Sequence, residues 1–203
     1  QRQMCIRDSP HSDHIGGMPA VLDSFNVKNA YLPNASASSD IYADFLDKLD
    51  VEGCDVYEAK NGVSVIKTEN LSAFFVAPCE SEYKNLNNYS AVLKLVYNDN
   101  SFLFTGDAQS QSEKQITADI SADVVKVGHH GSKTSSTQAF VSAVSPKYAV
   151  IEVGKDNSYG HPDEVVLERW QSAGAIVLRT DLNGNITFTS NGNSISYVCE
   201  KGN

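Results

Sequence analysis

The chain has 203 residues, 41% hydrophobic and 20% charged, a composition typical of a globular domain with one sizeable core. Its formal net charge of −9 argues against a surface that binds phosphate backbones broadly, since such binding draws on clustered Lys and Arg. No run approaches the roughly eighteen apolar residues of a membrane-spanning helix. The four cysteines show no CxxC spacing, so they predict neither a disulfide framework nor a compartment.

The first nine residues differ from the rest of the chain. They read QRQMCIRDS, show no apolar periodicity and interrupt a metal-binding motif. We interpret residues 1–9 as non-native sequence, of the kind found at the ends of assembled environmental sequence; a disordered, mildly basic native N-terminus is the alternative. Residues 10–203 are therefore assigned to one partial domain, and the first nine are left out of the fold prediction.

After Pro10, short apolar strands alternate with helical segments, which is typical of a layered α/β sandwich. Ile41, Phe45 and Leu49 recur four residues apart and predict a helix with one buried stripe. In the first half of the chain we expect helices over 18–25 and 39–49, strands over 27–32, 55–59, 63–67 and 71–76, and a hairpin of 90–97 with 102–105.

The second half repeats the alternation. We expect helices near 111–118, 137–143 and 163–173, strands over 123–127, 148–153 and 176–179, and a closing hairpin of 185–189 with 194–199.

A metal-ligand cluster is predicted at residues 10–17, which read PHSDHIGG. Two imidazoles, His11 and His14, and the carboxylate of Asp13 lie within four residues and run into a diglycine turn. Imidazole nitrogen and carboxylate oxygen suit zinc, manganese or iron, and a turn lets neighbouring side chains converge on an ion.

Asp107 follows an apolar strand and a glycine, in the segment SFLFTGDA. A carboxylate at such a strand end can reach into a cleft and bridge two cations. A simple strand-ending turn is the alternative.

A buried strand then leads to the paired histidines His129 and His130, followed by Gly131, Ser132 and Lys133. Neighbouring residues on a strand point to opposite faces, so one histidine is expected to bind metal and the other to contact substrate or orient a ligand. We favour His130 as the ligand. The hydroxyl of Ser132 and the cation of Lys133 suit phosphate oxygens.

Two further segments carry polar groups that suit substrate binding. Asn88 lies in the run NNYS before an apolar strand, where its amide could position a substrate. His161 stands in NSYGHP before an expected helix. Its imidazole could hold an anionic oxygen or protonate a leaving group, and capping of the helix is the alternative.

Taken in order, these motifs resemble the metallo-β-lactamase superfamily, and within it the domain of ComEC-type DNA-uptake proteins. The resemblance runs from Pro10 to about Ile186. It rests on HxHxDH at His11, Asp13 and His14, the bridging aspartate at Asp107, and the family segments NNxS, GHHGS, NxYGHP and RTD. The first histidine of HxHxDH falls at position 9, where this sequence has Ser9. We interpret that departure as lost sequence.

The resemblance implies an α/β fold, a four-layer αββα sandwich of the metallo-β-lactamase type, lacking its first strands. It implies a metal-dependent phosphodiesterase or nuclease with one or two divalent ions, zinc or manganese, held by His11, Asp13, His14, Asp107 and His130. Asp13 or Asp107 would orient the attacking hydroxide, and His161 or His129 would stabilise the leaving oxygen. With Ser9 in place of a histidine, this chain is expected to bind metal more weakly than an intact relative.

The expected substrate is a phosphodiester, with single-stranded DNA as the substrate that the resemblance suggests. A non-catalytic module that keeps the fold and guides DNA or a partner is the alternative, favoured by Asn87 and Asn88 where many family members carry a metal-binding histidine. The resemblance implies the extracytoplasmic face of a bacterial membrane or secretion, with the cytoplasm as alternative. Attachment of a longer parent protein to a membrane stays open.

Overall fold

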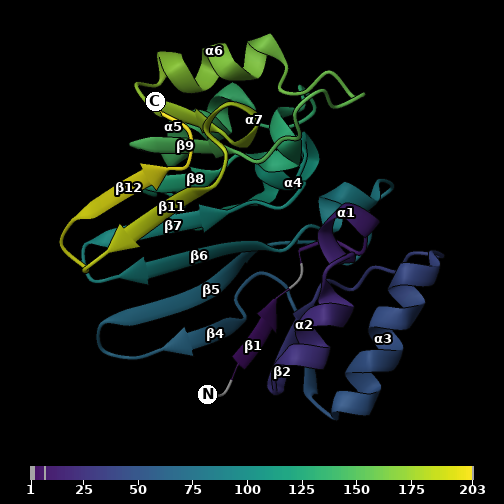
Figure 1. The fold of residues 1–203 in the computed structure, drawn as a ribbon. Coiled ribbons are helices and arrows are strands. Elements are labelled where there is room, and N and C mark those ends of the chain that lie inside the picture. Colours follow the sequence, from purple (N-terminus) through teal and green to yellow (C-terminus); the bar gives the residue numbers. More distant parts are fainter. Residues whose placement is uncertain (1–2, 7, 203) are drawn as a thin grey trace.

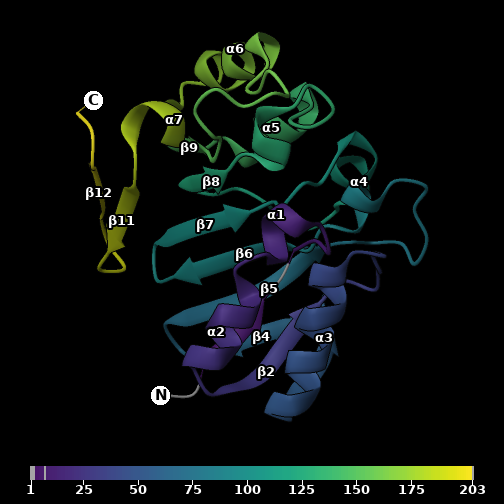
Figure 2. The same ribbon diagram turned by 45° about the vertical axis from the view of Figure 1, so that its right-hand side comes forward.

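The computed structural model of the chain describes residues 3–6 and 8–202. It forms four layers, with two sheets face to face and helices on the outer side of each (Figures 1 and 2). The first sheet is parallel in the order β1-β2-β3, formed by β1 (Gln3–Ile6), β2 (Val27–Leu32) and β3 (Asp55–Glu58). Its helices are α1 (Ser12–Ile15), α2 (Met18–Ser24) and α3 (Asp40–Glu52).

The second sheet has seven strands in the order β10-β9-β8-β7-β6-β5-β4. Its strands are β4 (Ser64–Lys67), β5 (Leu71–Ala77), β6 (Val92–Tyr97), β7 (Asn100–Phe104), β8 (Val124–Lys126), β9 (Tyr148–Ile151) and β10 (Ile176–Arg179). Strands β4 to β7 pair antiparallel, whereas β7 to β10 pair parallel. The loops that follow the parallel strands β7 and β8 therefore open at the same edge of the sheet.

Helices of the second half cover the outer face of this sheet (Figure 1). They are α4 (Ser110–Gln115), α5 (Gln138–Val144) and α6 (Glu164–Ser172), and α7 (Thr180–Asn183) follows β10. The chain closes with an antiparallel hairpin of β11 (Ile186–Ser190) and β12 (Ile195–Cys199). The hairpin packs on β9 through Tyr148, whose ring lies 5.4 Å from that of Phe188 and 5.3 Å from that of Tyr197.

Three hydrophobic cores separate the four layers. One joins α1, α2 and α3 to β2 and contains Ile15, Phe45 and Leu49. A second lies between the two sheets, around Phe75. The third and largest joins the seven-stranded sheet to α5 and α6, around Trp170. The faces that meet between neighbouring layers are apolar, because burial of apolar surface is the main stabilising contribution to a layered fold.

The predicted fold class is confirmed: the chain is an α/β protein with a large central sheet and helices arranged as in the metallo-β-lactamase sandwich. Element boundaries differ by a few residues. Helix α3 continues past the predicted end at Leu49 to Glu52, and stops where Gly53 adopts a left-handed φ of 67°. At its start, Ser39 accepts a hydrogen bond from the backbone N–H of Tyr42 (3.2 Å).

The segment 1–9 was left out of the fold prediction, but within it Gln3–Ile6 forms β1 against β2. Residues 1, 2 and 7 lie outside the described part of the chain. The interpretation of 1–9 as non-native sequence, and of the sandwich as lacking its first strands, stays a prediction. In the described residues, no helix combines the length and apolar character that crossing a membrane requires.

Candidate metal centre

Asp13 and His14 are positioned by α1, a single helical turn that begins after His11. The sequence prediction placed a turn here; the turn is helical because Gly16 N–H donates to Ser12 O (2.8 Å). A Cβ at position 16 would lie 2.7 Å from that carbonyl oxygen, so only glycine fits. Ile15 is buried in the first core. Helix α1 is thereby anchored to the core that it shares with α2, α3 and β2, and it holds Asp13 and His14 beside that core.

Asp107 lies in the loop after β7 and is buried, with 3% of its surface exposed. Its backbone N–H donates to the hydroxyl of Ser90 (3.0 Å). Gly106 before it has a φ of +51°, and a Cβ there would meet the Asp8 side chain at 2.9 Å. The glycine therefore allows the carboxylate to turn towards α1.

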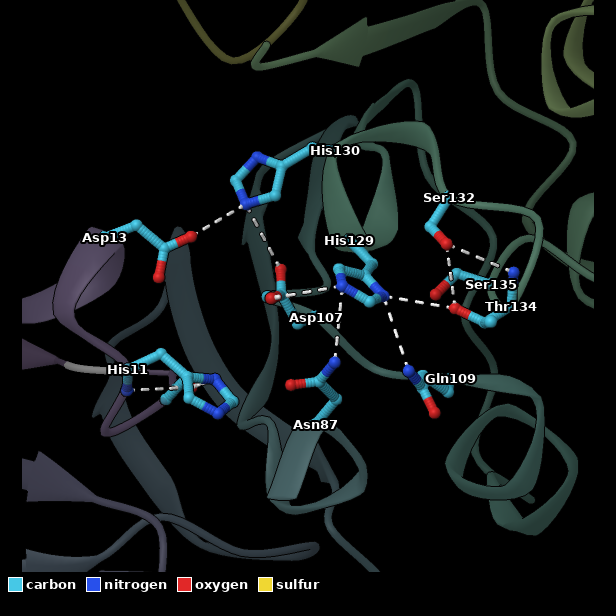
Figure 3. Close-up of polar contacts among 12 residues, drawn as sticks. His11, Asp13, Asn87, Asp107, Gln109, His129, His130, Ser132, Thr134 and Ser135 are labelled. Atoms are coloured by element: carbon cyan, nitrogen blue, oxygen red, sulfur yellow. Dashed lines mark hydrogen bonds and ion pairs between the residues drawn. The ribbon is translucent and has the colours of Figure 1, made fainter. Parts of the chain in front are cut away.

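His129 and His130 lie in the 3₁₀ turn Gly128–Gly131, not on the preceding strand β8. Both have positive φ, 51° and 53°. The expectation that neighbouring histidines face opposite sides of a strand is therefore wrong for this pair, because β8 ends at Lys126 and the turn directs both rings to the same edge (Figure 3). His130 Nδ1 donates to the carbonyl of Glu152 (2.7 Å), which leaves the lone pair of Nε2 facing the site.

Four predicted ligands converge. One ligand atom each of Asp13, His14, Asp107 and His130 lies within 4.8 Å of all the others. His130 Nε2 is 3.3 Å from Asp13 Oδ2, and His14 Nε2 is 3.2 Å from Asp107 Oδ2. Figure 3 shows the carboxylates of Asp13 and Asp107 both directed towards the same nitrogen of His130.

The donor set fits a divalent cation. Two imidazole nitrogens and two carboxylates suit zinc, manganese or iron. Asp107 Oδ1 and His130 Nε2 are buried and have no hydrogen-bond partner among the described residues. Buried polar atoms are costly without a partner, and a cation between them would supply one. The structure thus holds a candidate metal site of Asp and His residues.

Charge within the cluster is strongly coupled. Burial opposes protonation of His14, but hydrogen bonds and charges of Asp107 and Asp8 outweigh it and raise the pKa of His14 to about 10. Burial likewise opposes ionisation of Asp107, but His14, Lys126 and His130 lower its pKa to about 2. Without a metal, the cluster is therefore an ion pair, and a metal would replace the His14 proton.

A cavity of about 340 Å³ lies beside this cluster. Its lining residues are His11, Ser12, Asp13, Asn87, Asp107, His129, His130, Tyr159 and His161. The two histidines predicted to act on substrate, His129 and His161, both line it, with ring centroids 5.8 Å apart. Neither belongs to the four-residue cluster. The geometry therefore brings predicted ligands and predicted substrate-contacting histidines to one cavity.

His11 lies in the same cavity but outside the four-residue cluster. Its Nδ1 is 2.8 Å from the hydroxyl of Ser9, which is buried with 1% of its surface exposed. Position 9 is where the family motif has its first histidine. The side chains at positions 9 and 11 thus point towards each other beside the cluster.

The predicted substrate-binding residues are placed away from the cavity lining. Asn88 is buried, and its Oδ1 accepts from the backbone N–H of Ser112 at the start of α4 (3.1 Å). Its neighbour Asn87 lines the cavity instead. Ser132 pairs its hydroxyl with that of Thr134 (3.0 Å), while Lys133 is exposed and donates its backbone N–H to Asp163 (2.9 Å).

Two residues of the site, Asp8 and Gln109, were not identified from the sequence. Asp8 contacts His14 Nδ1 (3.0 Å) but lies in the segment set aside as foreign. Around His129, polar contacts come from Thr134 (3.1 Å), Asn87 (3.3 Å) and Gln109 (3.4 Å) (Figure 3). Gln109 follows Asp107 by two residues, and this closeness in sequence is the one feature that could have indicated Gln109 as a residue of the site. Burial of His129 lowers its pKa, which favours the neutral form of this imidazole.

The described geometry agrees with comparison to known families. A model of the metallo-beta-lactamase superfamily matches residues 10–154, and the chain belongs to that superfamily. The chain is 35% identical over 179 residues to the ComE operon protein 3 of Bacillus subtilis (strain 168), covering 87% of this chain and 23% of that protein. It is 39% identical over 118 residues to the competence protein ComA of Neisseria gonorrhoeae, covering 56% and 17% respectively.

The resemblance to ComEC-type proteins inferred from the motifs is thus confirmed, and the chain spans about a quarter or less of the length of these relatives. Among solved structures, CmlA, a diiron beta-hydroxylase from Streptomyces venezuelae, superposes with a TM-score of 0.58 at 13% identity over 88% of this chain and 44% of that protein. At this identity the likeness concerns the fold alone.

Proposed function

We propose that this chain is a metal-dependent hydrolase of phosphodiesters, with single-stranded DNA as its substrate class. The observation that supports this most directly is the convergence of Asp13, His14, Asp107 and His130 within 4.8 Å, beside a 340 Å³ cavity that two further histidines line. Two of the relatives carry names that suggest DNA: the competence protein ComA of Neisseria gonorrhoeae, and recombination protein 2 of Haemophilus influenzae, which is 27% identical over 86% of this chain.

Each residue has a role that its position supports. A divalent cation held by the four ligands would polarise a phosphoryl oxygen and lower the pKa of a water. Asp13 is well exposed, at 59% of its side chain, and can orient the attacking water from the open side of the cluster. His161 and His129 line the cavity beside the four ligands, where either can donate a hydrogen bond to the leaving oxygen.

Metal-stimulated hydrolysis tests the proposal. The purified chain is incubated with bis(p-nitrophenyl) phosphate and with a single-stranded oligonucleotide, in Mn²⁺, in Zn²⁺ and in a chelator. We expect turnover that requires metal and that Asp107→Ala abolishes, because Asp107 contacts both His14 and His130. Asn88→Ala should keep much of the activity and lower the thermal midpoint, because Asn88 braces α4.

The same assay addresses the non-catalytic alternative. Asn87 stands where family members carry a metal-binding histidine and contacts His129 rather than the four-residue cluster. Binding of metal and oligonucleotide without turnover would support a module that guides DNA and would contradict the proposed hydrolase. Equal losses in Asp107→Ala and Asn88→Ala, with both variants folded, would contradict the metal assignment.

A further inference from the structure

A second cavity, of about 380 Å³, adjoins the metal centre. It is lined by Asp13, His130, Glu152, Val153, Gly154, Asn157, Tyr159 and His161. Asp13, His130, Tyr159 and His161 line both cavities. A phosphodiester carries two substituents, so a diester whose phosphate lies at the cluster would direct one substituent into each cavity. The second cavity is therefore placed to receive the group next to the scissile phosphate.

Tyr159 is the aromatic side chain on the shared wall. It is 83% exposed, and one face of its ring is stacked on His161, with centroids 6.0 Å apart and planes at 16°. The other face is left free for a flat ligand. Asn157 ties the loop across Tyr159: its Nδ2 donates to His161 O (2.7 Å), and its Oδ1 accepts from His161 N–H (3.0 Å). The loop that carries Tyr159 is thereby fixed before a ligand arrives, which reduces the entropy cost of binding.

The charges of the residues that line the two cavities argue against binding of phosphates by Lys and Arg. Among the described residues that line the two cavities there is no Lys or Arg, whereas Asp13, Asp107 and Glu152 are acidic. The chain as a whole carries a net charge of −9. A nucleic acid strand at this site therefore cannot be held by clustered cations, and affinity must come from the metal and from uncharged contacts such as stacking.

We propose that Tyr159 is a stacking platform for a nucleobase adjacent to the scissile phosphodiester. This inference rests on the proposed function and narrows its substrate to esters that carry a base. Every nucleobase offers a flat face to an aromatic ring, so one tyrosine binds bases without selecting their sequence. A quaternary ammonium headgroup would also contact Tyr159, but cation recognition is typically built from a cage of several aromatic rings, and Tyr159 is the only Phe, Tyr or Trp among the described lining residues.

The test compares two fluorescein-labelled hexamers of equal charge: single-stranded (dT)6, and an abasic hexamer that keeps the phosphates. Both hexamers carry phosphorothioate linkages, which slow the hydrolysis expected in Mn²⁺. Anisotropy titrations use the full chain in Mn²⁺, with a gel to show that the oligomers stay intact. We expect Tyr159→Ala to weaken (dT)6 binding about tenfold, the order of one lost stacking contact, and to leave the abasic hexamer unchanged. Tyr159→Phe and Tyr159→Trp should stay within about twofold of the original protein.

Tyr57→Ala is the matched control, because Tyr57 is also exposed and stacked on one face, against Tyr31 (5.2 Å), but lines a separate cavity. It should not change binding of either hexamer. Equal weakening of both hexamers by Tyr159→Ala, no weakening of either, or displacement of (dT)6 by millimolar choline would overturn the inference. Tyr159-dependent binding without any hydrolysis would support the stacking platform and contradict the proposed hydrolase. Hydrolysis with binding that does not depend on Tyr159 would support the hydrolase and contradict the platform.

Discussion

His14 Nδ1 lies 3.0 Å from Oδ1 of Asp8, on the side of the ring opposite the metal cluster. A carboxylate in this position fixes the ring orientation, holds a proton on Nδ1 and directs Nε2 towards Asp107 and the metal cluster. We expect Asp8→Ala to weaken metal binding by about tenfold to a hundredfold without loss of the fold. Competition with a chromophoric chelator measures the affinity, and circular dichroism checks the fold.

The matched control for Asp8 is Asp44→Ala, which removes an exposed carboxylate of α3 far along the chain from the ligands. It should leave the metal affinity unchanged. An Asp8→Ala protein that binds metal as tightly as the original would show that α1 alone orients His14.

Metal binding should release a proton at neutral pH. The pKa of His14 is raised to about 10 in the metal-free cluster, so the imidazole is protonated below that pH and must lose its proton before Nε2 can bind an ion. Protons therefore compete with the metal, and affinity should rise by about tenfold per pH unit between pH 6 and pH 9. Calorimetry in two buffers with different ionisation enthalpies counts the protons. A pH-independent affinity over this range would contradict the ion-pair description of the cluster.

The contact between Ser9 and His11 predicts how a second ion could be accommodated. The Ser9 hydroxyl lies 2.8 Å from His11 Nδ1, so an imidazole introduced by Ser9→His would lie beside that of His11. We expect this substitution to raise the metal content from about one to about two ions per chain, as in two-metal hydrolases. Elemental analysis after gel filtration measures it. Ser9→Leu, which adds bulk without a ligand, should not gain metal; two tightly held ions in the original chain would contradict the prediction.

His161 should act on the substrate and not on the metal. It lines the cavity but lies outside the four-residue cluster. We expect His161→Ala to leave metal content unchanged and to reduce turnover by roughly a hundredfold, the order expected for a general acid. The loss should be smaller with bis(p-nitrophenyl) phosphate, whose leaving group needs little protonation. A parallel fall in metal content would make His161 a ligand; no change in either would leave it a structural residue beside Pro162.

Most of the fold could be predicted from periodicity and turn residues. The apolar four-residue spacing of Ile41, Phe45 and Leu49 predicted α3. Phe45 and Leu49 are buried, but the buried stripe does not include Ile41, which lies in the first turn of the helix and is 41% exposed. What escaped prediction were elements of about one turn, such as α1 and α7, which are too short to show a period. Strand β1 escaped for another reason, since its segment has no alternating pattern and its pairing with β2 is a tertiary contact.

The site was predicted less completely. Residue type and spacing indicate Asp13 and His14, whereas Asp107 and His130 are indicated by the order of the motifs, which resembles the metallo-β-lactamase superfamily. Sequence periodicity could not show that the positive φ values of His129 and His130 turn both rings to one edge. Nor could it separate Asn87, which lines the cavity, from Asn88, which braces α4, since adjacent amides differ only in which way the backbone turns them.

The candidate ligands come from two different cores. Asp13 and His14 belong to α1, which is anchored by Ile15 in the core of the first layer, whereas Asp107 and His130 follow strands of the largest core. An ion held by all four ligands would couple local unfolding of the two cores, because the free energy of metal binding is lost when either core unfolds. Amide hydrogen exchange in α1, α2 and α3 should therefore slow on addition of Mn²⁺, and chelation should let this layer exchange independently of the seven-stranded sheet.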